Sequence, residues 1–187
     1  MRIIGGRLKG IQFFAPANLP VRPTTDMAKE ALFNILHNNY NFEDCEVLDL
    51  FSGTGNVSFE FASRGVKKIK AVDQHAGCIF WIKSVISKHH LSEIEPHKAD
   101  VFKLLTQEKH QYQIIFADPP YNLPQIPKIA QLVIENKLLT PNGMLIIEHP
   151  SMLKLNQLPG YTQTRKYGNS SFSFFEPLSG GEGSTFV

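Results

Sequence analysis

Four consecutive residues, Asp118-Pro119-Pro120-Tyr121, follow the apolar run from Ile114 to Ala117 and could hold a planar amine. The two prolines fix φ and remove two backbone donors, so we expect the carbonyl groups of this segment to point outward without partners. One carboxylate and one carbonyl would then accept the two N–H groups of an exocyclic amine, and the tyrosine ring would stack on the attached base. The segment predicts an amino-group-modifying site. A tight turn with an exposed acid is the alternative interpretation.

A second segment, Asp49-Leu50-Phe51-Ser52-Gly53-Thr54-Gly55, has the composition of a cofactor loop. Its glycines allow a sharp turn and a close approach of the backbone to a ligand. Asp73 follows 20 residues after Gly53, at the end of the next apolar run, where its carboxylate could accept both ribose hydroxyls. Asp100 follows the third run in the same way. We therefore expect a nucleoside-containing cofactor above these strand ends.

The charge of this loop selects among cofactors. Nicotinamide and flavin folds also place a GxG after a strand, but Ser58 stands where the third glycine of GxGxxG would be. Asp49 would repel a pyrophosphate and attract an ammonium group. S-adenosylmethionine carries an ammonium and a sulfonium and no phosphate, so the loop predicts this cofactor. Asp49 could instead cap the turn that follows it.

Strands and helices alternate around both segments. Near-continuous apolar strands separated by helices predict an α/β fold with a doubly wound, mostly parallel sheet covered on both faces. A C-terminal antiparallel hairpin, turning at 168–169, would bring the sheet to seven strands. The expected strands are residues 47–51, 68–73, 95–99, 112–117, 144–148, 161–167 and 172–176, and the expected helices include 75–90, 125–137 and one starting at Val101.

The N-terminal residues predict a short extension before this domain. Residues 2–13 indicate a hairpin broken by glycines, followed by a proline-containing connector. Thr24-Thr25-Asp26 offers N-cap chemistry for a helix whose apolar face is Ala28, Leu32, Ile35 and Leu36. We expect a basic arm over residues 1–25, one catalytic domain over 26–177 and a flexible tail over 178–187.

The positive charge of the chain is concentrated in this arm. The net charge is only +2, yet residues 1–30 hold five basic residues against two acidic ones, and the remainder is nearly balanced. A basic arm beside a neutral domain suits a polyanionic partner. An ordinary solvated hairpin explains the charge equally well. The candidate phosphate contacts are Arg2, Arg7, Lys9 and Arg22.

The bulk composition excludes several classes of protein. Hydrophobic residues make up 42% of the 187 residues and charged residues 19%, as in a globular domain. No apolar run approaches the ~20 residues that a membrane helix needs, and the N-terminus has no secretory signal pattern. Cys45 and Cys78 are not spaced as a metal clip. We expect a cytoplasmic monomer with free thiols, no metal and no membrane contact.

Both segments also carry a family resemblance. Asp49 to Gly55 together with Asp118-Pro119-Pro120-Tyr121 resembles the class I S-adenosylmethionine-dependent methyltransferases. With Arg2-Ile3-Ile4-Gly5-Gly6, the run from Arg22 to Asp26 and the run from Glu30 to Asn34, the chain resembles the bacterial 16S rRNA guanine-N2 methyltransferases of the RsmD type. The resemblance covers Met1 to about Glu176. It implies a methyltransferase that acts on the small ribosomal subunit or its 16S rRNA.

The resemblance also assigns roles by position. It implies that Gly53 and Gly55 lie beside the methionine part of the cofactor, Asp73 on the ribose and Asp100 near the adenine. Asp118 and the Pro119 carbonyl would hold the target amine, with Tyr121 stacked on the base. The sequence departs from the family at Ile11, Met27, Asn56 and Ser58, where basic or small residues are usual. The first two departures put the RNA grip of the arm in doubt.

Other functions remain compatible with the same loop. Adenine N6 in DNA and a glutamine amide also present an NH₂ on a planar group. A DNA enzyme usually needs a target-recognition domain, for which this chain has no length left. A catalytically idle RNA-binding scaffold would be expected to have lost the Asp118 segment.

Overall fold

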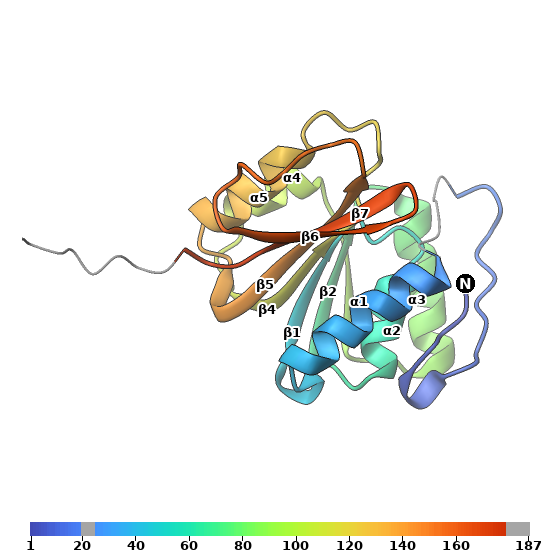
Figure 1. Ribbon diagram of the computed structural model, residues 1–187. Coiled ribbons are helices and arrows are strands. Elements are labelled where there is room, and N and C mark those ends of the chain that lie inside the picture. The colour runs from blue at the N-terminus through green and yellow to red at the C-terminus, as the bar shows by residue number, and fades with distance from the viewer. Residues whose placement is uncertain (20–24, 179–187) are drawn as a thin grey trace, which may run out of the picture.

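The computed structural model describes residues 1–19 and 25–178. Within these residues, seven strands form one sheet and five α-helices pack on it (Figure 1). The strands are β1 (Glu46–Leu50), β2 (Lys68–Asp73), β3 (Ile94–Lys98), β4 (Tyr112–Ala117), β5 (Leu139–Pro150), β6 (Tyr161–Tyr167) and β7 (Ser170–Phe175). The helices are α1 (Asp26–Asn39), α2 (Asn56–Ser63), α3 (Ala76–His89), α4 (Val101–Gln107) and α5 (Ile126–Glu135).

The strand order is β3-β2-β1-β4-β5-β7-β6. Strands β1 to β5 run parallel, and β7 pairs antiparallel with both β5 and β6. The chain first builds outward from β1 to β3 and then returns to place β4 on the other side of β1. This confirms the predicted doubly wound sheet with its C-terminal antiparallel hairpin. The reversal of strand order lies between β1 and β4.

Helices cover both faces of the sheet, as Figure 1 shows: α1, α2 and α3 lie on one side and α4 and α5 on the other. The alternation of side chains along each strand separates the two apolar cores. In β4, Ile114 and Phe116 enter the core beneath α1 to α3, which we call the first core. Ile115 and Ala117 enter the second core, beneath α4 and α5. Such two-sided burial explains why the strand sequences are almost continuously apolar.

The N-terminal residues pack onto the first core. The expected hairpin is a loop closed by one antiparallel bridge between Arg2 and Gln12, with a 3₁₀ turn at Gly6–Leu8. Hydrogen bonds from Ile3 N to Ile11 O (2.9 Å) and from Gly10 N to Ile3 O (2.8 Å) hold its two sides together. Ile3 and Phe13 are buried among core residues of the domain. The arm is thereby fastened to the domain through its own apolar side chains.

Four strands differ from their predicted bounds: β1 and β3 begin and end one residue earlier, β7 runs over Ser170–Phe175 instead of 172–176, and β5 differs most. β5 begins at Leu139 instead of Met144, and the pairing register with β4 shifts between Tyr112 and Ile114, which accommodates the extra residues. β3 contains Pro96 and lies at the edge of the sheet. The bonds from Ile69 N to Glu93 O and from Ala99 N to Asp73 O direct the odd-numbered residues of this segment toward β2. The missing N–H of Pro96 therefore falls on the outer side, where no ladder bond is lost.

The described residues lack two features that would indicate a membrane or a metal. No helix in the described ranges combines the length and apolar character that crossing a bilayer requires. In the same part of the chain, no three His, Cys, Asp or Glu side chains cluster in a way that could hold a metal ion. The absence of a metal and the monomeric, cytoplasmic state stay predictions.

Candidate functional site

The two segments singled out from the sequence meet at the carboxyl ends of β1 and β4. These strands are parallel neighbours, with Leu50 opposite Ala117. Asp118 N donates to Leu50 O at 3.3 Å, which extends the pairing by one residue. Ligands of doubly wound sheets bind at this kind of reversal in strand order, beyond the carboxyl ends of the strands. We call this edge, formed by the ends of β1, β2, β4 and β5, the rim.

The loop between β1 and α2 adopts conformations that a ligand-binding turn requires. Phe51, Gly53 and Gly55 have φ angles of 59°, 53° and 79°. A non-glycine residue such as Phe51 with positive φ costs on the order of 1–3 kcal/mol and is found mainly where function requires it. At Gly55 an added Cβ would lie 2.9 Å from Cζ of Phe59, so a side chain has no room there. The loop is therefore shaped by backbone geometry that few other sequences permit.

Neighbouring groups hold this loop in place. Gly53 N donates to Asp73 Oδ2 at 2.9 Å, and His75 N donates to Asp73 Oδ1 at 2.7 Å. Trp81 Nε1 donates to Thr54 O at 3.2 Å. Each oxygen of a carboxylate can accept further bonds, so Asp73 is oriented without being saturated. Its position at the end of β2 is compatible with the predicted ribose contact, which stays a prediction.

Asp100 is the N-cap of α4 and accepts from Lys103 N at 2.8 Å. Its side chain is exposed. The structure thus gives Asp100 a local structural role, and its predicted position near the adenine is not tested.

Asp49 differs from these two acids because it is buried, with only 1% of its surface exposed. Ser58 Oγ donates to Asp49 Oδ2 at 2.5 Å. Burial raises the pKa of Asp49 to about 7, the Ser58 hydrogen bond opposes this rise and the charge of Asp73 adds to it. A carboxyl group in this state gains from any cation placed beside it. The predicted contact with an ammonium group therefore has an electrostatic reason and stays a prediction.

The residues of this loop fit S-adenosylmethionine. Ser52 Oγ is buried and has no hydrogen-bond partner among the described residues, as a group waiting for a ligand would. The acids Asp49 and Asp73 suit a cationic ligand with ribose hydroxyls and would disfavour a pyrophosphate. Gly53 and Gly55 supply the backbone approach.

The Asp118 segment departs from its expected form in one detail. Leu123 N donates to Pro120 O at 2.9 Å, so this carbonyl is engaged in a turn and the expectation that both proline carbonyls are open is wrong. Pro119 remains the candidate acceptor. Tyr121 is half-buried, and its hydroxyl donates to Glu148 Oε1 at 3.2 Å. The tyrosine ring is thereby tied to β5.

Sequence reasoning missed Glu148. Ala117 lies opposite Ile147, so Glu148 is level with Asp118 on the neighbouring strand. Its side chain is 6% exposed. The signal was present, because Glu148 follows the apolar run of β5 as Asp118 follows that of β4.

Sequence reasoning also missed a buried charge network behind the cofactor loop. Lys29 of α1 is fully buried, and its Nζ lies 3.4 Å from Glu60 Oε2 and 3.0 Å from Asn56 Oδ1 of α2. Arg64 Nε donates to Glu60 Oε1 at 2.9 Å, and Ile4 N donates to Glu60 Oε2 at 3.0 Å. The detectable signal was a lysine on the apolar stripe of α1.

The residues predicted to contact phosphate have different surroundings in the structure. Arg2 pairs with Asp26 at 3.1 Å and Arg7 with Glu93 at 2.7 Å. Lys9 is exposed and has no ion pair within the described residues. Arg22 lies outside the described residues. Lys29, which contributed to the basic charge of the N-terminal region, is buried and paired, so the accessible charge is smaller than the sequence indicates.

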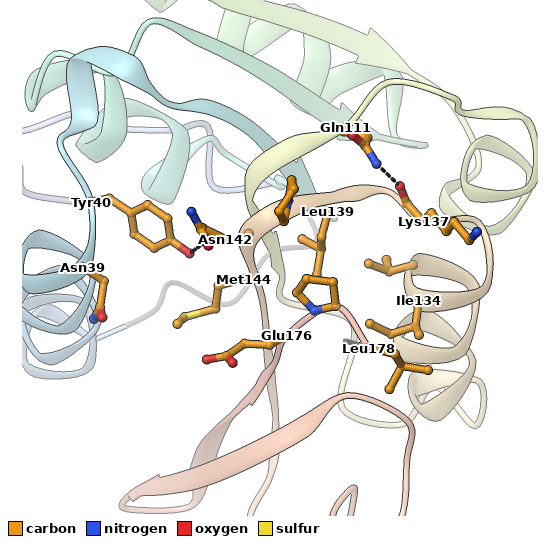
Figure 2. Close-up of a pocket in the computed structure, with 14 residues that line it drawn as sticks. Asn39, Tyr40, Gln111, Ile134, Lys137, Leu139, Asn142, Met144, Glu176 and Leu178 are labelled. Carbon is orange, nitrogen blue, oxygen red and sulfur yellow. Dashed lines mark hydrogen bonds between the residues drawn. The ribbon is translucent and has the colours of Figure 1, made fainter. Parts of the chain in front are cut away.

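A hollow of about 770 Å³ opens at the other end of the sheet. Figure 2 shows Tyr40, Leu139, Asn142 and Met144 around it, with the Tyr40 hydroxyl bonded to Asn142 O. It adjoins the start of β5, whereas the rim lies at the ends of the parallel strands. None of the residues predicted to do chemistry lines it.

Comparison with known proteins gives the chain its family. A family model described as "Conserved hypothetical protein 95" matches residues 1–176. The chain belongs to this family. It is 30% identical over 183 residues to YlbH of Bacillus subtilis (strain 168), a provisionally named rRNA methyltransferase, covering 94% of this chain and 98% of YlbH. It is also 28% identical over 153 residues to ribosomal RNA small subunit methyltransferase D of Buchnera aphidicola subsp. Baizongia pistaciae (strain Bp), covering 82% and 78% of the two chains.

The fold is similar to that of solved methyltransferase structures. One of these is the 16S rRNA N2 G1207 methyltransferase RsmC of T. thermophilus in complex with AdoMet and guanosine. The TM-score is 0.70 at 21% identity, over 95% of this chain and 49% of that chain. This likeness confirms the class I methyltransferase fold, and the relatives confirm the predicted resemblance to the RsmD type.

Proposed function

We propose that this protein transfers a methyl group from S-adenosylmethionine to the N2 amine of a guanine in the 16S rRNA of the small ribosomal subunit. The observation that carries the proposal is the hydrogen bond from Asp118 N to Leu50 O, which joins the amine-holding segment to the start of the cofactor loop. The names of the relatives support rRNA as the substrate. The guanosine bound by RsmC supports the base.

The chemistry required of the rim follows from the weakness of the nucleophile. The lone pair of a guanine N2 amine is delocalised into the ring, so the nitrogen must turn tetrahedral before it attacks. The Asp118 carboxylate and the Pro119 carbonyl would accept its two N–H groups out of the ring plane. Such acceptors stabilise the positive charge that develops on nitrogen and therefore bind the transition state better than the ground state. The cofactor, when bound, supplies an electrophilic methyl group on its sulfonium.

Asp118 acts in this scheme as an acceptor and a charge partner. The nitrogen loses its proton after the methyl group has been added, when its acidity is high, so no strong base is needed before that point. The remaining contribution is positional: the shared rim holds the amine in line with the methyl group.

The target base must leave its stack to reach the rim. Stacking on the Tyr121 ring would return about 1–3 kcal/mol of that cost. Sequence-specific RNA recognition generally selects such exposed bases. The hydroxyl bond to Glu148 fixes the ring before the base arrives, which lowers the entropy lost on stacking.

The arm supplies the candidate contacts to the RNA backbone, and Lys9 is the strongest of them because Arg2 and Arg7 already form ion pairs. Replacing Lys9 by Gln should reduce the slope of log affinity against log salt by roughly one unit, as the loss of one phosphate contact does. An unchanged slope would assign Lys9 to the solvated surface.

The alternative substrates have less support. Adenine N6 and a glutamine amide fit the Asp118 segment equally well, but the relatives described above are named for rRNA and give these alternatives no support.

The decisive experiment compares wild type with Asp118→Ala. Methyl transfer from labelled S-adenosylmethionine is measured on naked 16S rRNA and on small subunits from cells lacking the protein, and the product nucleoside is identified by mass spectrometry. Asp118→Ala should keep cofactor affinity within severalfold and lose turnover by about 100- to 1,000-fold, the effect of removing one transition-state contact. Asp44→Ala, an exposed acid bonded to Asn41, is the matched control. Label on adenine, or full turnover by Asp118→Ala, would refute the proposal.

A further inference from the structure

We propose that Glu148 reads the N1–H of the target guanine and so sets the preference of this site for guanine over adenine. The inference rests on the proposed function, because it deepens the account of the same rim. It assigns a specificity-determining role to a residue on β5, one strand away from the Asp118 segment.

The first support is the register of the sheet. Phe116 lies opposite Ile146 and Ala117 opposite Ile147, so Asp118, which directly follows β4, is level with Glu148, which lies within β5. Adjacent strands of a sheet lie about 4.8 Å apart. Side chains that start one strand spacing apart can converge on two neighbouring donors of one base. Two acids at the same level on adjacent strands therefore form a paired acceptor at the rim.

The second support is the hydrogen bond that anchors Glu148 to the stacking residue. Tyr121 is the residue proposed to lie on the face of the base, and its hydroxyl donates to Glu148 Oε1 at 3.2 Å. Glu148 Oε1 lies at the hydroxyl end of the Tyr121 ring. A base stacked on this ring would therefore have its edge near the carboxylate. Because a carboxylate has about four acceptor positions on its two oxygens, one phenol bond orients Glu148 and leaves it able to accept more.

The third support is burial. Glu148 is 6% exposed and pairs in the sheet with Phe172, a fully buried residue of the first core. A polar group in such surroundings discriminates strongly between ligands, because a wrong partner leaves it desolvated without a bond. An acid on the open surface would have water as an alternative partner and would discriminate little.

The edge of guanine matches this arrangement and the edge of adenine does not. Guanine presents N1–H beside its N2 amine, which gives adjacent donors for Glu148 and Asp118. Adenine presents a bare N1 acceptor beside its N6 amine, and the lone pair of that nitrogen would face the Glu148 carboxylate. The N1–H···carboxylate bond also shifts electron density from N1 toward the exocyclic nitrogen, which makes the N2 amine a better nucleophile.

The test varies both partners of the proposed bond: the N1–H donor of the base and the Glu148 acceptor of the protein. Small subunits are reconstituted with 16S rRNA in which a synthetic segment carries guanine or 2-aminopurine at the methylated position. 2-Aminopurine keeps the exocyclic amine but has a bare N1. Wild type should methylate guanine about 10- to 100-fold faster than 2-aminopurine, the range of discrimination of a good base contact. Glu148→Gln, whose amide can donate to the bare N1, should reduce this preference to within about threefold.

Two variants act as controls. Glu135→Gln, at an exposed position of α5, should leave the preference unchanged. Tyr121→Phe removes the hydroxyl that orients Glu148 but keeps the ring and the carboxylate, and should lower the preference for guanine less than Glu148→Gln does. Because 2-aminopurine also lacks O6, the informative quantity is the change of preference between proteins.

The outcomes separate this inference from the proposed function. If wild type methylates neither base, the proposed function fails and the inference fails with it. If wild type methylates guanine and Glu148→Gln loses the same factor on both bases, the function stands and the inference is overturned. Equal rates of wild type on the two bases overturn it as well, even where Glu148→Gln fails to fold.

Discussion

Two buried carboxylates are associated with helix α2, and their surroundings differ. Glu60 lies within α2, fully buried, and receives Lys29, Arg64 and the amide of Ile4. Asp49 lies beneath the start of α2, almost as deeply buried, and accepts hydrogen bonds from Ser58, an uncharged residue. One helix thus joins a compensated buried charge to an uncompensated one.

The difference separates Glu60, whose carboxylate stabilises the fold, from Asp49, whose carboxylate can bind a ligand. Burying a charge is costly unless it is paired, and a pair once formed is costly to break. Burial lowers the pKa of Lys29, and the nearby Glu60 opposes that change, so the two residues depend on each other. No cation within residues 1–19 and 25–178 pairs with Asp49, so its charge is left to be stabilised by a ligand.

The largest effect is expected when the compensated site is broken. Glu60→Gln keeps the shape of the side chain but leaves Lys29 buried without its counter-charge, and should lower the free energy of unfolding by about 3–5 kcal/mol. Urea unfolding measures this change. Glu95→Gln, which breaks the exposed Lys68–Glu95 pair, is the control and should cost at most about 0.5 kcal/mol. Adding Lys29→Met to Glu60→Gln should recover part of the loss. Similar costs for Glu60→Gln and Glu95→Gln would show that the buried network contributes little.

The free energy of unfolding should depend on pH because of Asp49. The folded protein holds the pKa of Asp49 near 7, above its ordinary value of 3.8, because the group is buried. Between about pH 4 and 7 the unfolded chain loses this proton while the folded protein keeps it, so the free energy of unfolding should fall with rising pH by on the order of 3 kcal/mol. Asp49→Asn should lack this component, and the two proteins should be compared by urea unfolding at pH 4, 6 and 8.

The ligand provides an independent check on Asp49. S-adenosylhomocysteine carries the same ammonium group as the cofactor and should bind wild type more tightly at pH 8 than at pH 5, since Asp49 is then ionised. Asp49→Asn should bind weakly at both values. If the free energies of unfolding of wild type and Asp49→Asn changed with pH in the same way, the pKa of Asp49 would not lie near 7.

The smallest effect concerns the attachment of the arm to the end of α2. Ser63 Oγ donates to Gly5 O at 2.5 Å and accepts from Leu8 N at 2.9 Å. Ser63→Ala should cost about 1–2 kcal/mol, because two partly buried backbone groups lose their partner. Faster hydrogen exchange of the Leu8 amide would localise the change. Ser84→Ala, at an exposed position of α3, should change neither quantity. Indistinguishable results for the two serines would mean that the arm is held by its apolar side chains alone.

Much of the fold could be predicted because its strands are locally distinct. β4 has the bounds that were expected, and the hairpin turns at Gly168-Asn169 as its residues indicate. The start of β5 could not be predicted, because Pro141-Asn142-Gly143 has the composition of a turn and enters the strand only through a register shift against β4. Local composition cannot report such a shift.

The sequence predicts which residues form the site better than it predicts which residues they contact. The carboxyl ends of parallel strands meet at one edge, so the glycine loop and Asp118 could be placed together once the strand order was assumed. The contacts that engage the arm cations could not be predicted, since Arg7 reaches Glu93, 86 positions away. In the sequence, Lys29 counts toward the basic charge of residues 1–30. Only the packing of α1 on α2 shows that it is internal.

Pro96 has a consequence for how this protein behaves in a crowded solution. An outermost strand offers its free amides to any passing extended chain, and stacking of that kind leads to fibrous aggregates. In β3 the ring of Pro96 interrupts this row of donors without disturbing the attachment to β2. A foreign segment therefore finds no continuous ladder to complete along this border, and the molecule is protected there against templated self-association.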